Sequence, residues 1–202
     1  MRFYLIDPKD HRYSNYIFYL LSDDDYLVLR ESYRHLQCQV CKKIDEIAAL
    51  QLPLEPDVQI QGRFDLNQTS DGMYHCNDRV KKIVEDNGIS GIRFIELPGK
   101  EDCYVMVPTV EVLVDRSQPG HKYNEPKCPN CGRYREVFGF ARLSPLSLPE
   151  DPMVIFTPEI WLEDSRGKNA VLLVSQQVMQ IMKVQKVSGI MFSELAQSWP
   201  EG

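Results

Sequence analysis

The sequence lacks long apolar runs, and no stretch approaches the roughly 20 apolar residues that a membrane-spanning helix needs. Basic residues are not in excess either, because 23 Lys and Arg stand against 29 Asp and Glu, for a net charge of −6. That balance argues against direct nucleic-acid binding, which usually requires a basic surface. An acidic protein is better suited to a basic protein partner, which its charge attracts.

Motifs that mark common catalytic sites are absent as well. The sequence has no phosphate-binding glycine loop, no nucleophile elbow and no metallohydrolase pattern. Its many carboxylates show no spacing that selects a catalytic pair. The sequence therefore shows no pattern that selects a catalytic site.

Cysteine is scarce, and six cysteines in 202 residues are too few for a scaffold built on disulfides. The chain starts Met1-Arg2-Phe3-Tyr4, without the features of a signal peptide. We therefore expect a cytoplasmic protein. In that reducing compartment, paired cysteines more often bind metal than form disulfides.

Four of the cysteines form two C-x-x-C pairs, Cys38-Gln-Val-Cys41 and Cys128-Pro-Asn-Cys131. Two such pairs supply the four sulfurs of a closed tetrahedral zinc site. After the second pair, Gly132 frees the backbone to turn its amides toward the sulfurs. The first pair has Lys42 at that position. We expect one structural Zn²⁺ ion bound by all four cysteines.

The two pairs are far apart, since 128 − 41 = 87 positions separate Cys41 from Cys128, against about 15–20 in a zinc ribbon. A shared ion would therefore join two distant parts of the chain. Metal-free pairs, two local disulfides or one redox-active pair remain alternatives. His35 and His121 are possible substitute ligands. We expect the two other cysteines, Cys76 and Cys103, to be buried and unreactive.

An internal repeat is the second organising feature. Residues 80–98 and 178–196 align without a gap at an offset of 178 − 80 = 98. Eight positions are identical: Val80/Val178, Ile83/Ile181, Ser90/Ser188, Gly91/Gly189, Ile92/Ile190, Phe94/Phe192, Glu96/Glu194 and Leu97/Leu195. Apolar residues at helical spacing, a Ser-Gly turn and then alternating residues predict a helix, a turn and a strand in each copy.

The ends of the two predicted helices also have recognisable residues. Asn77 and Ser175 lie at matching positions and suit N-caps. Gly88 suits a left-handed C-terminal cap, and Lys186 replaces it in the second copy. Because the helices are short, they need to pack an apolar stripe on a sheet to be stable.

The remaining pattern predicts strands at residues 2–6, 58–66 and 103–114, the last split or at an edge because of Pro108. The sequence thus predicts an α+β fold with one domain over residues 1–202 and an internal repeat at about 34–114 and 120–196. Each half should contain a mostly antiparallel sheet with a helix-turn-strand unit. The shared four-cysteine zinc site should join the halves.

Acidic residues give the only indication of a partner-binding surface. The densest run is Asp23, Asp24 and Asp25, which is a candidate contact region and equally suits a solvated turn. Further candidates are Glu101, Asp102, Glu150 and Asp151.

The cysteine motifs and the repeated segment together resemble the double-CXXCG motif family of bacterial immunity proteins. The similarity covers roughly residues 34–196 and is best at Cys128-Pro-Asn-Cys131-Gly132 and in Val-Ser-Gly-Ile-Met-Phe-Ser-Glu-Leu (residues 187–195). The first motif departs from the family pattern at Lys42. The resemblance places the family's cysteines at Cys38, Cys41, Cys128 and Cys131. It implies a non-enzymatic protein that binds and blocks a cognate toxin.

An immunity protein needs a rigid surface rather than catalytic residues, and an acidic one would suit a basic target such as a nuclease toxin. Two alternatives from other classes remain. One is a zinc-binding nucleic-acid or regulatory module, which the acidic charge disfavours. The other is a thiol-disulfide oxidoreductase, whose C-x-x-C would be expected at a helix start in a thioredoxin-like βαβ pattern that the sequence does not show.

Overall fold

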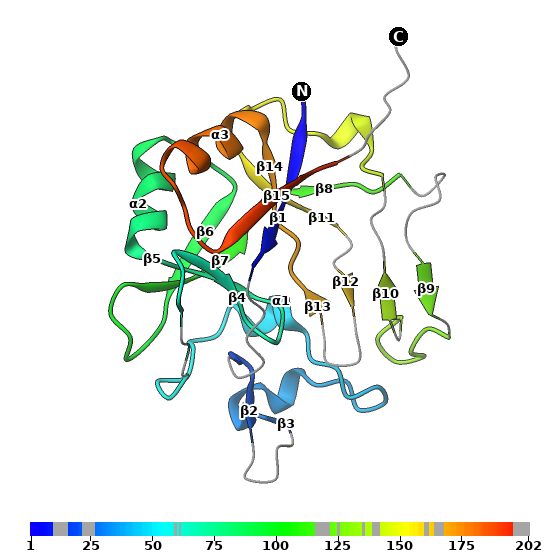
Figure 1. Ribbon diagram of the computed structural model, residues 1–202. Helices are drawn as coiled ribbons and strands as arrows, with labels where there is room; N and C mark the ends of the chain where they lie inside the picture. Colours follow the sequence, from blue (N-terminus) through cyan, green and yellow to red (C-terminus); the bar gives the residue numbers. More distant parts are fainter. Residues whose placement is uncertain are drawn as a thin grey trace.

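A computed structural model describes residues 1–9, 16–21, 27–58, 60, 62–115, 122–124, 126–134, 136–138, 142–159, 162–163 and 168–195. In this part of the chain the fold is α+β, with short helices and several mostly antiparallel sheets (Figure 1). The predicted fold class is thereby confirmed. No helix in the described part has the length and apolar character that crossing a membrane requires.

The first large sheet has four strands in the order β4-β5-β7-β6. The strands are β4 (Leu66–Gln68), β5 (Tyr74–Asn77), β6 (Ile92–Glu96) and β7 (Cys103–Pro108), and all neighbours are antiparallel. Helix α2 (Asp78–Asp86) connects β5 to β6 and packs on the sheet through Val80, Ile83 and Val84.

The second large sheet has five strands in the order β15-β1-β14-β11-β8. They are β1 (Phe3–Pro8), β8 (Glu111–Val112), β11 (Ile155–Pro158), β14 (Leu173–Ser175) and β15 (Ile190–Glu194), and only the β11–β8 pair is parallel. Helix α3 (Gln176–Val184) connects β14 to β15 and contacts both β14 and β1.

Smaller elements surround the two sheets. A hairpin of β2 (Tyr19–Leu21) and β3 (Leu27–Leu29) leads into η1 (Glu31–Leu36) and α1 (Glu46–Ala49). A four-stranded sheet in the order β13-β12-β10-β9 lies at the right of the molecule in Figure 1, on the side away from α2. Its strands are β9 (Lys122–Asn124), β10 (Glu136–Phe138), β12 (Leu162–Glu163) and β13 (Lys168–Asn169), and η2 (Pro145–Ser147) precedes β11.

The repeated segment folds as predicted, and its two copies agree residue for residue. Adding 98 to the bounds of α2 and β6 gives the bounds of α3 and β15. The caps agree too, because Asn77 accepts a hydrogen bond from the Val80 N–H at 3.2 Å and Ser175 accepts one from the Val178 N–H at 3.1 Å. The sequence pattern therefore predicted this unit correctly.

Strands β1 and β7 extend the equivalence beyond the predicted repeat. Each has six residues ending in proline, and each lies between the two strands that flank the helix of a repeat. Their registers match, since Pro8 pairs with Ile190 as Pro108 pairs with Ile92, and Tyr4 with Glu194 as Tyr104 with Glu96. We infer that β1 begins the first repeat and β7 the second, which differs from the expected bounds of about 34–114 and 120–196. Each repeat then inserts its first strand into the sheet of the other.

The Ser-Gly turns also join the two repeats reciprocally. In the first turn, the Ser90 N–H donates to the Met153 carbonyl at 2.7 Å, and the Ile155 N–H donates back to the Ser90 carbonyl at 2.9 Å. In the second turn, the Leu66 N–H donates to the Ser188 carbonyl at 3.2 Å. Each repeat thus places its turn against a strand of the other, β11 or β4.

Apolar side chains on both faces of the five-stranded sheet form the core. The larger cluster spans both repeats and includes Ile6, Val174 and Val178 on one face. The smaller cluster includes Phe3 and Phe156, whose rings meet edge to face at 5.2 Å. Alternation along β1 places Phe3 and Tyr4 on opposite faces, as a strand buried on both sides requires.

Candidate metal centre

Two turns present the C-x-x-C pairs, and we call residues 38–43 the first cysteine loop and residues 128–133 the second. In the first loop, the Lys42 N–H donates to the Cys38 carbonyl at 2.9 Å and the Cys38 N–H to the Lys43 carbonyl at 2.8 Å. The second loop repeats both hydrogen bonds at positions 90 residues later, at 2.9 and 2.7 Å. The two loops therefore have the same backbone conformation.

The missing glycine of the first motif does not change the loop. Lys42 has a φ of 63° and Gly132 a φ of 73°, so both residues adopt the left-handed conformation that this turn needs. A lysine there is strained by roughly 1–2 kcal/mol, because its Cβ approaches the following carbonyl. The departure at Lys42 thus affects the stability of the loop and leaves its geometry intact.

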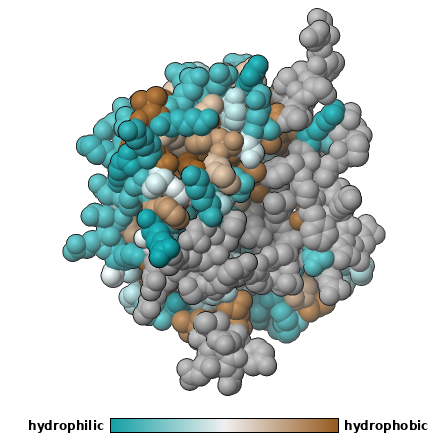
Figure 2. Space-filling model, in the orientation of Figure 1, coloured by the Kyte–Doolittle hydropathy of each residue, from teal (hydrophilic) through white to brown (hydrophobic). Residues whose placement is uncertain are grey.

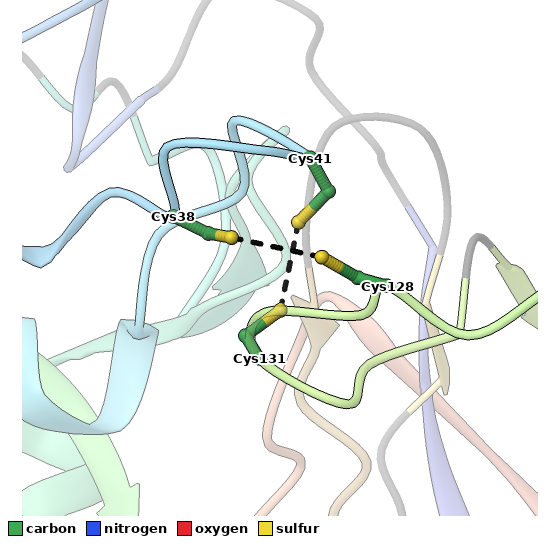
Figure 3. A group of neighbouring side chains, drawn as sticks. All are labelled: Cys38, Cys41, Cys128 and Cys131. Atoms are coloured by element: carbon green, nitrogen blue, oxygen red, sulfur yellow. Dashed lines mark hydrogen bonds between the residues drawn. The ribbon is translucent and has the colours of Figure 1, made fainter.

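The loops face each other, and their four sulfurs converge (Figure 3). The Cys38 and Cys128 sulfurs are 3.7 Å apart, the Cys41 and Cys131 sulfurs 3.6 Å, and all four lie within 4.8 Å of one another. A disulfide would need about 2.05 Å. A tetrahedron with metal–sulfur bonds of about 2.3 Å has edges of about 3.8 Å. The four cysteines can therefore hold one metal ion.

A second layer of contacts joins the loops, again reciprocally. The Lys43 Nζ donates to the Tyr134 carbonyl at 3.4 Å, and Arg133, its counterpart 90 residues later, donates to the Ile44 carbonyl. Arg133 also forms a two-pronged ion pair with the buried Glu46 at 3.1 and 3.3 Å. Because each contact joins one cysteine loop to residues beside the other, these contacts hold the loops in register.

The four thiols differ in pKa, which hydrogen bonds lower for Cys38 and Cys128 and desolvation raises for Cys41 and Cys131. The Cys41 N–H and then the Asn130 side chain, 3.3 Å from the sulfur, help lower the pKa of Cys38 to about 5. The Cys131 N–H likewise lowers the pKa of Cys128. Partial desolvation, followed by neighbouring sulfurs, raises the pKa of Cys131 to about 12, and desolvation also raises the pKa of Cys41. A bound dication would reverse this rise, since metal coordination deprotonates thiols.

Most of the predicted residues can be located. The four cysteines expected as ligands are brought together, whereas the exposed His35 is not part of their cluster. His121, Asp23, Asp24 and Asp25 lie outside the described residues. The other acidic candidates, Glu101, Asp102, Glu150 and Asp151, are exposed in two separate loops. Sequence reasoning missed the roles of Lys43, Glu46 and Arg133, although the 90-residue offset from Lys43 to Arg133 was available as a signal.

The remaining cysteines lie elsewhere. Cys76 and Cys103 are buried in the first sheet, as expected, and burial raises the pKa of both thiols. Each C-x-x-C pair lies in a turn rather than at the start of a helix, with α1 beginning only at Glu46. This placement differs from the thioredoxin-like arrangement that an oxidoreductase of that type requires.

Neither of two comparisons with known proteins assigns the chain to a family. A scan against protein-family models found no matching family, and a search of curated proteins found no matching sequence. The metal centre is therefore identified from its ligands alone. Four cysteines, two from each half of the chain, can hold one metal ion.

Proposed function

We propose that this protein is an immunity protein that binds and neutralises a cognate bacterial toxin, and that one Zn²⁺ ion stabilises it. The observation that carries the proposal is the meeting of two C-x-x-C loops, one from each repeat, at a single cluster of four sulfurs. The double cysteine motif and the closing Ser-Gly-Ile segment resemble those of double-CXXCG immunity proteins. A toxin inhibitor needs a fixed shape more than reactive groups, and a shared ion between the halves would provide one.

Zinc is the metal that the ligand set favours. Four thiolates in a tetrahedron suit Zn²⁺, and a site with no open position is structural rather than catalytic. Native mass spectrometry of protein purified under reducing conditions should show one zinc per chain. Cys131→Ser should lose it, whereas Cys76→Ser, which changes a buried cysteine outside the cluster, should retain it. A metal-free wild-type protein would contradict this part of the proposal.

The partner is best described as a basic protein, with a nuclease toxin as the favoured kind. The net charge of −6 supports this proposal, because an acidic inhibitor would be steered toward the positive substrate cleft of a nuclease. By covering that cleft, the inhibitor would block substrate without any reaction of its own. Association should then slow as ionic strength rises.

Co-expression with the product of the neighbouring gene tests the function directly. If that product is the cognate toxin, the wild-type protein should restore growth and co-purify with it in a 1:1 complex. Cys38→Ser/Cys41→Ser should protect less well because the inhibitor loses its rigidity, and Cys76→Ser should protect fully. Full growth inhibition in the presence of abundant, folded wild-type protein would refute the assignment for that gene pair.

A further inference from the structure

A cleft of about 350 Å³ opens beside β5 and β7, where the second Ser-Gly turn approaches the first sheet. Its wall includes Asn67, His75, Lys100, Cys103 and Ser188. No residue of either cysteine loop lines it. The cleft is therefore distinct from the metal centre, and it lies where the two repeats meet, a common location for ligand sites.

The second repeat shows that the fold does not require this cleft. Strand registers identify the positions in the second sheet that correspond to its polar floor. The three polar residues correspond to three apolar ones: His75 to Leu173, Cys103 to Phe3, and Asn67 to Phe156. These three apolar side chains are buried together in the smaller core cluster. The same place is thus filled with apolar groups in one repeat and left polar and open in the other.

His75 has an unsatisfied hydrogen-bonding group at this floor. Burial raises the pKa of the Cys103 thiol, so the thiol keeps its proton and can donate it to His75 Nδ1, 3.9 Å away. The proton of the neutral imidazole then lies on Nε2. This nitrogen is buried and has no hydrogen-bond partner among the described residues. A buried donor without an acceptor costs stability, which indicates that a ligand supplies the acceptor.

Positive charge lies over the same floor. Lys100 and Arg63 both line the cleft, and no hydrogen bond or ion pair engages either side chain within the described structure. Burial and then the charge of Lys100 lower the pKa of His75, and the same charge partly offsets the rise that burial causes in the pKa of Cys103, so Lys100 acts on both groups.

Three carboxylates also line the cleft, those of Asp65, Glu101 and Asp102. Asp65 is already engaged by Arg79 at 2.6 Å and by the Ser188 N–H at 2.9 Å. Glu101 and Asp102 are exposed, on the turn that precedes β7. The polar floor of Asn67, His75 and Cys103 therefore offers a donor and contains no carboxylate.

We propose that this cleft binds a small oxyanion, a carboxylate or phosphate group of a small molecule. The His75 Nε2–H and the Lys100 ammonium donate to its oxygens, and Arg63 contributes charge from the wall. The site depends neither on the bound metal nor on toxin binding. The cleft volume lies at the lower end of the range for small-molecule sites, so the ligand is compact.

Nuclear magnetic resonance can test the site on the full-length protein. Inorganic phosphate and sodium acetate are titrated separately at constant ionic strength, and the His75 Nε2–H resonance is followed. At least one anion should shift that resonance saturably, and comparison of the two arms identifies phosphate or carboxylate as the preferred group. If neither arm gives a saturable shift, the proposal fails.

Three variants distinguish a built site from general charge attraction. Lys100→Gln should weaken binding about tenfold or more, because it removes a charge-assisted hydrogen bond. Lys82→Gln removes the same charge from the exposed face of α2, where Lys82 pairs with Asp86 at 3.7 Å, and should leave affinity unchanged. Equal weakening by both variants would refute the site. Asn67→Phe/His75→Leu/Cys103→Phe copies the filled arrangement of the second repeat and should fold without binding, so retained binding would also refute it.

Discussion

Two lysines occupy positions where the other repeat has glycine. Lys42 corresponds to Gly132 and Lys186 to Gly88, and all four have φ between 52° and 73°. A Cβ added at Gly88 or Gly132 would meet no atom within 4 Å, so the side chain itself is tolerated and only the backbone is strained. Lys42→Gly and Lys186→Gly should each stabilise the protein by about 0.5–1 kcal/mol. This is the backbone strain that glycine relieves minus the conformational entropy that glycine loses on folding. Urea denaturation of each variant checks this, and a loss of stability in both would contradict it.

His75 should make the protein sensitive to acid. Burial lowers its pKa to about 4, whereas an unfolded histidine titrates near 6.5. Since the pKa of His75 is lower in the folded protein, the stability that its neutral form contributes is fully present above about pH 6.5 and is lost as pH falls toward 4. His75→Leu, which copies Leu173, should reduce the loss of unfolding free energy across that interval by roughly 2–3 kcal/mol. Denaturation at several pH values measures the difference, and identical slopes would show that His75 is not responsible.

At the scale of elements, Asp71 anchors the segment before β2 to the turn between β4 and β5. Its carboxylate accepts the N–H groups of Ile17 and Phe18 at 2.7 and 2.8 Å and the Thr69 hydroxyl at 2.5 Å. Burial raises its pKa despite these hydrogen bonds. Because the pKa of Asp71 is higher in the folded protein than in the unfolded chain, the stability that its protonated form contributes is lost as pH rises through the folded pKa.

Two substitutions separate the hydrogen bonds of Asp71 from its charge. Asp71→Asn keeps an acceptor for both N–H groups and should stay within about 1 kcal/mol of wild type at pH 7, gaining relative to it as pH rises. Asp71→Leu leaves both N–H groups unpaired and should cost about 3 kcal/mol. Thermal and urea unfolding of the pair provide the measurement. Equal losses for Asn and Leu would mean that the charge itself stabilises the anchor.

The Ser-Gly turns give the clearest reason for the repeated sequence. A Cβ on Gly91 would lie 1.9 Å from the Ile155 carbonyl oxygen, and one on Gly189 would lie 2.2 Å from the Leu66 carbonyl oxygen. Both glycines also have positive φ, of 84° and 91°. The identical dipeptides are therefore needed because each fits against the backbone of the other repeat.

Alanine substitutions can separate this close contact from backbone strain. Gly91→Ala or Gly189→Ala should cost roughly 3 kcal/mol or more, because a backbone atom must move. Gly88→Ala has the strained φ without the collision and should cost about 0.5–1 kcal/mol, the strain less the entropy of glycine. Urea denaturation curves provide the three values. Equal costs at all three glycines would show that the contact between repeats contributes nothing.

Short-range sequence patterns correctly predicted the helices and strands that depend on neighbouring residues. The repeated helix, turn and strand follow from caps and apolar spacing, and the split at Pro108 gave β7 and β8 as expected. The predicted strand at residues 58–66 was wrong, because residues 63–65 form bends and regular pairing begins only at Leu66. Alternation there reflected burial of Val58 and Ile60 against the core rather than strand pairing.

Contacts between distant parts of the chain could not be read from local pattern. The four-cysteine cluster was predictable because metal chemistry fixes the ligand types and their spacing. Nothing local to residues 3–8 indicates that they pair with both β14 and β15, since pairing partners depend on the whole sheet. The roles of Glu46 and Arg133 were missed for the same reason.

At the scale of the whole molecule, two separate sets of contacts join the repeats. Exchanged strands and Ser-Gly turns hold the sheets together, while the cysteine loops meet elsewhere (Figures 1 and 3). Hydrophilic side chains cover most of the described surface over α2 (Figure 2), and its apolar residues Val80 and Val84 lie in the core. Loss of the metal centre should therefore leave the contacts between the sheets formed.

Metal removal should accordingly act locally before it acts globally. A strong chelator with reductant should first increase amide hydrogen exchange at Cys38 and Cys128, whose N–H groups donate within the cysteine loops. Ser90 and Ser188, whose N–H groups bond across the Ser-Gly turns, should remain protected. Because bound metal stabilises only the folded state, the midpoint of thermal unfolding should fall by roughly 10 °C. Cys76→Ser should respond like wild type, since its metal centre is intact. Exchange that rises equally at all four amides would show that the metal holds the whole fold rather than the two loops.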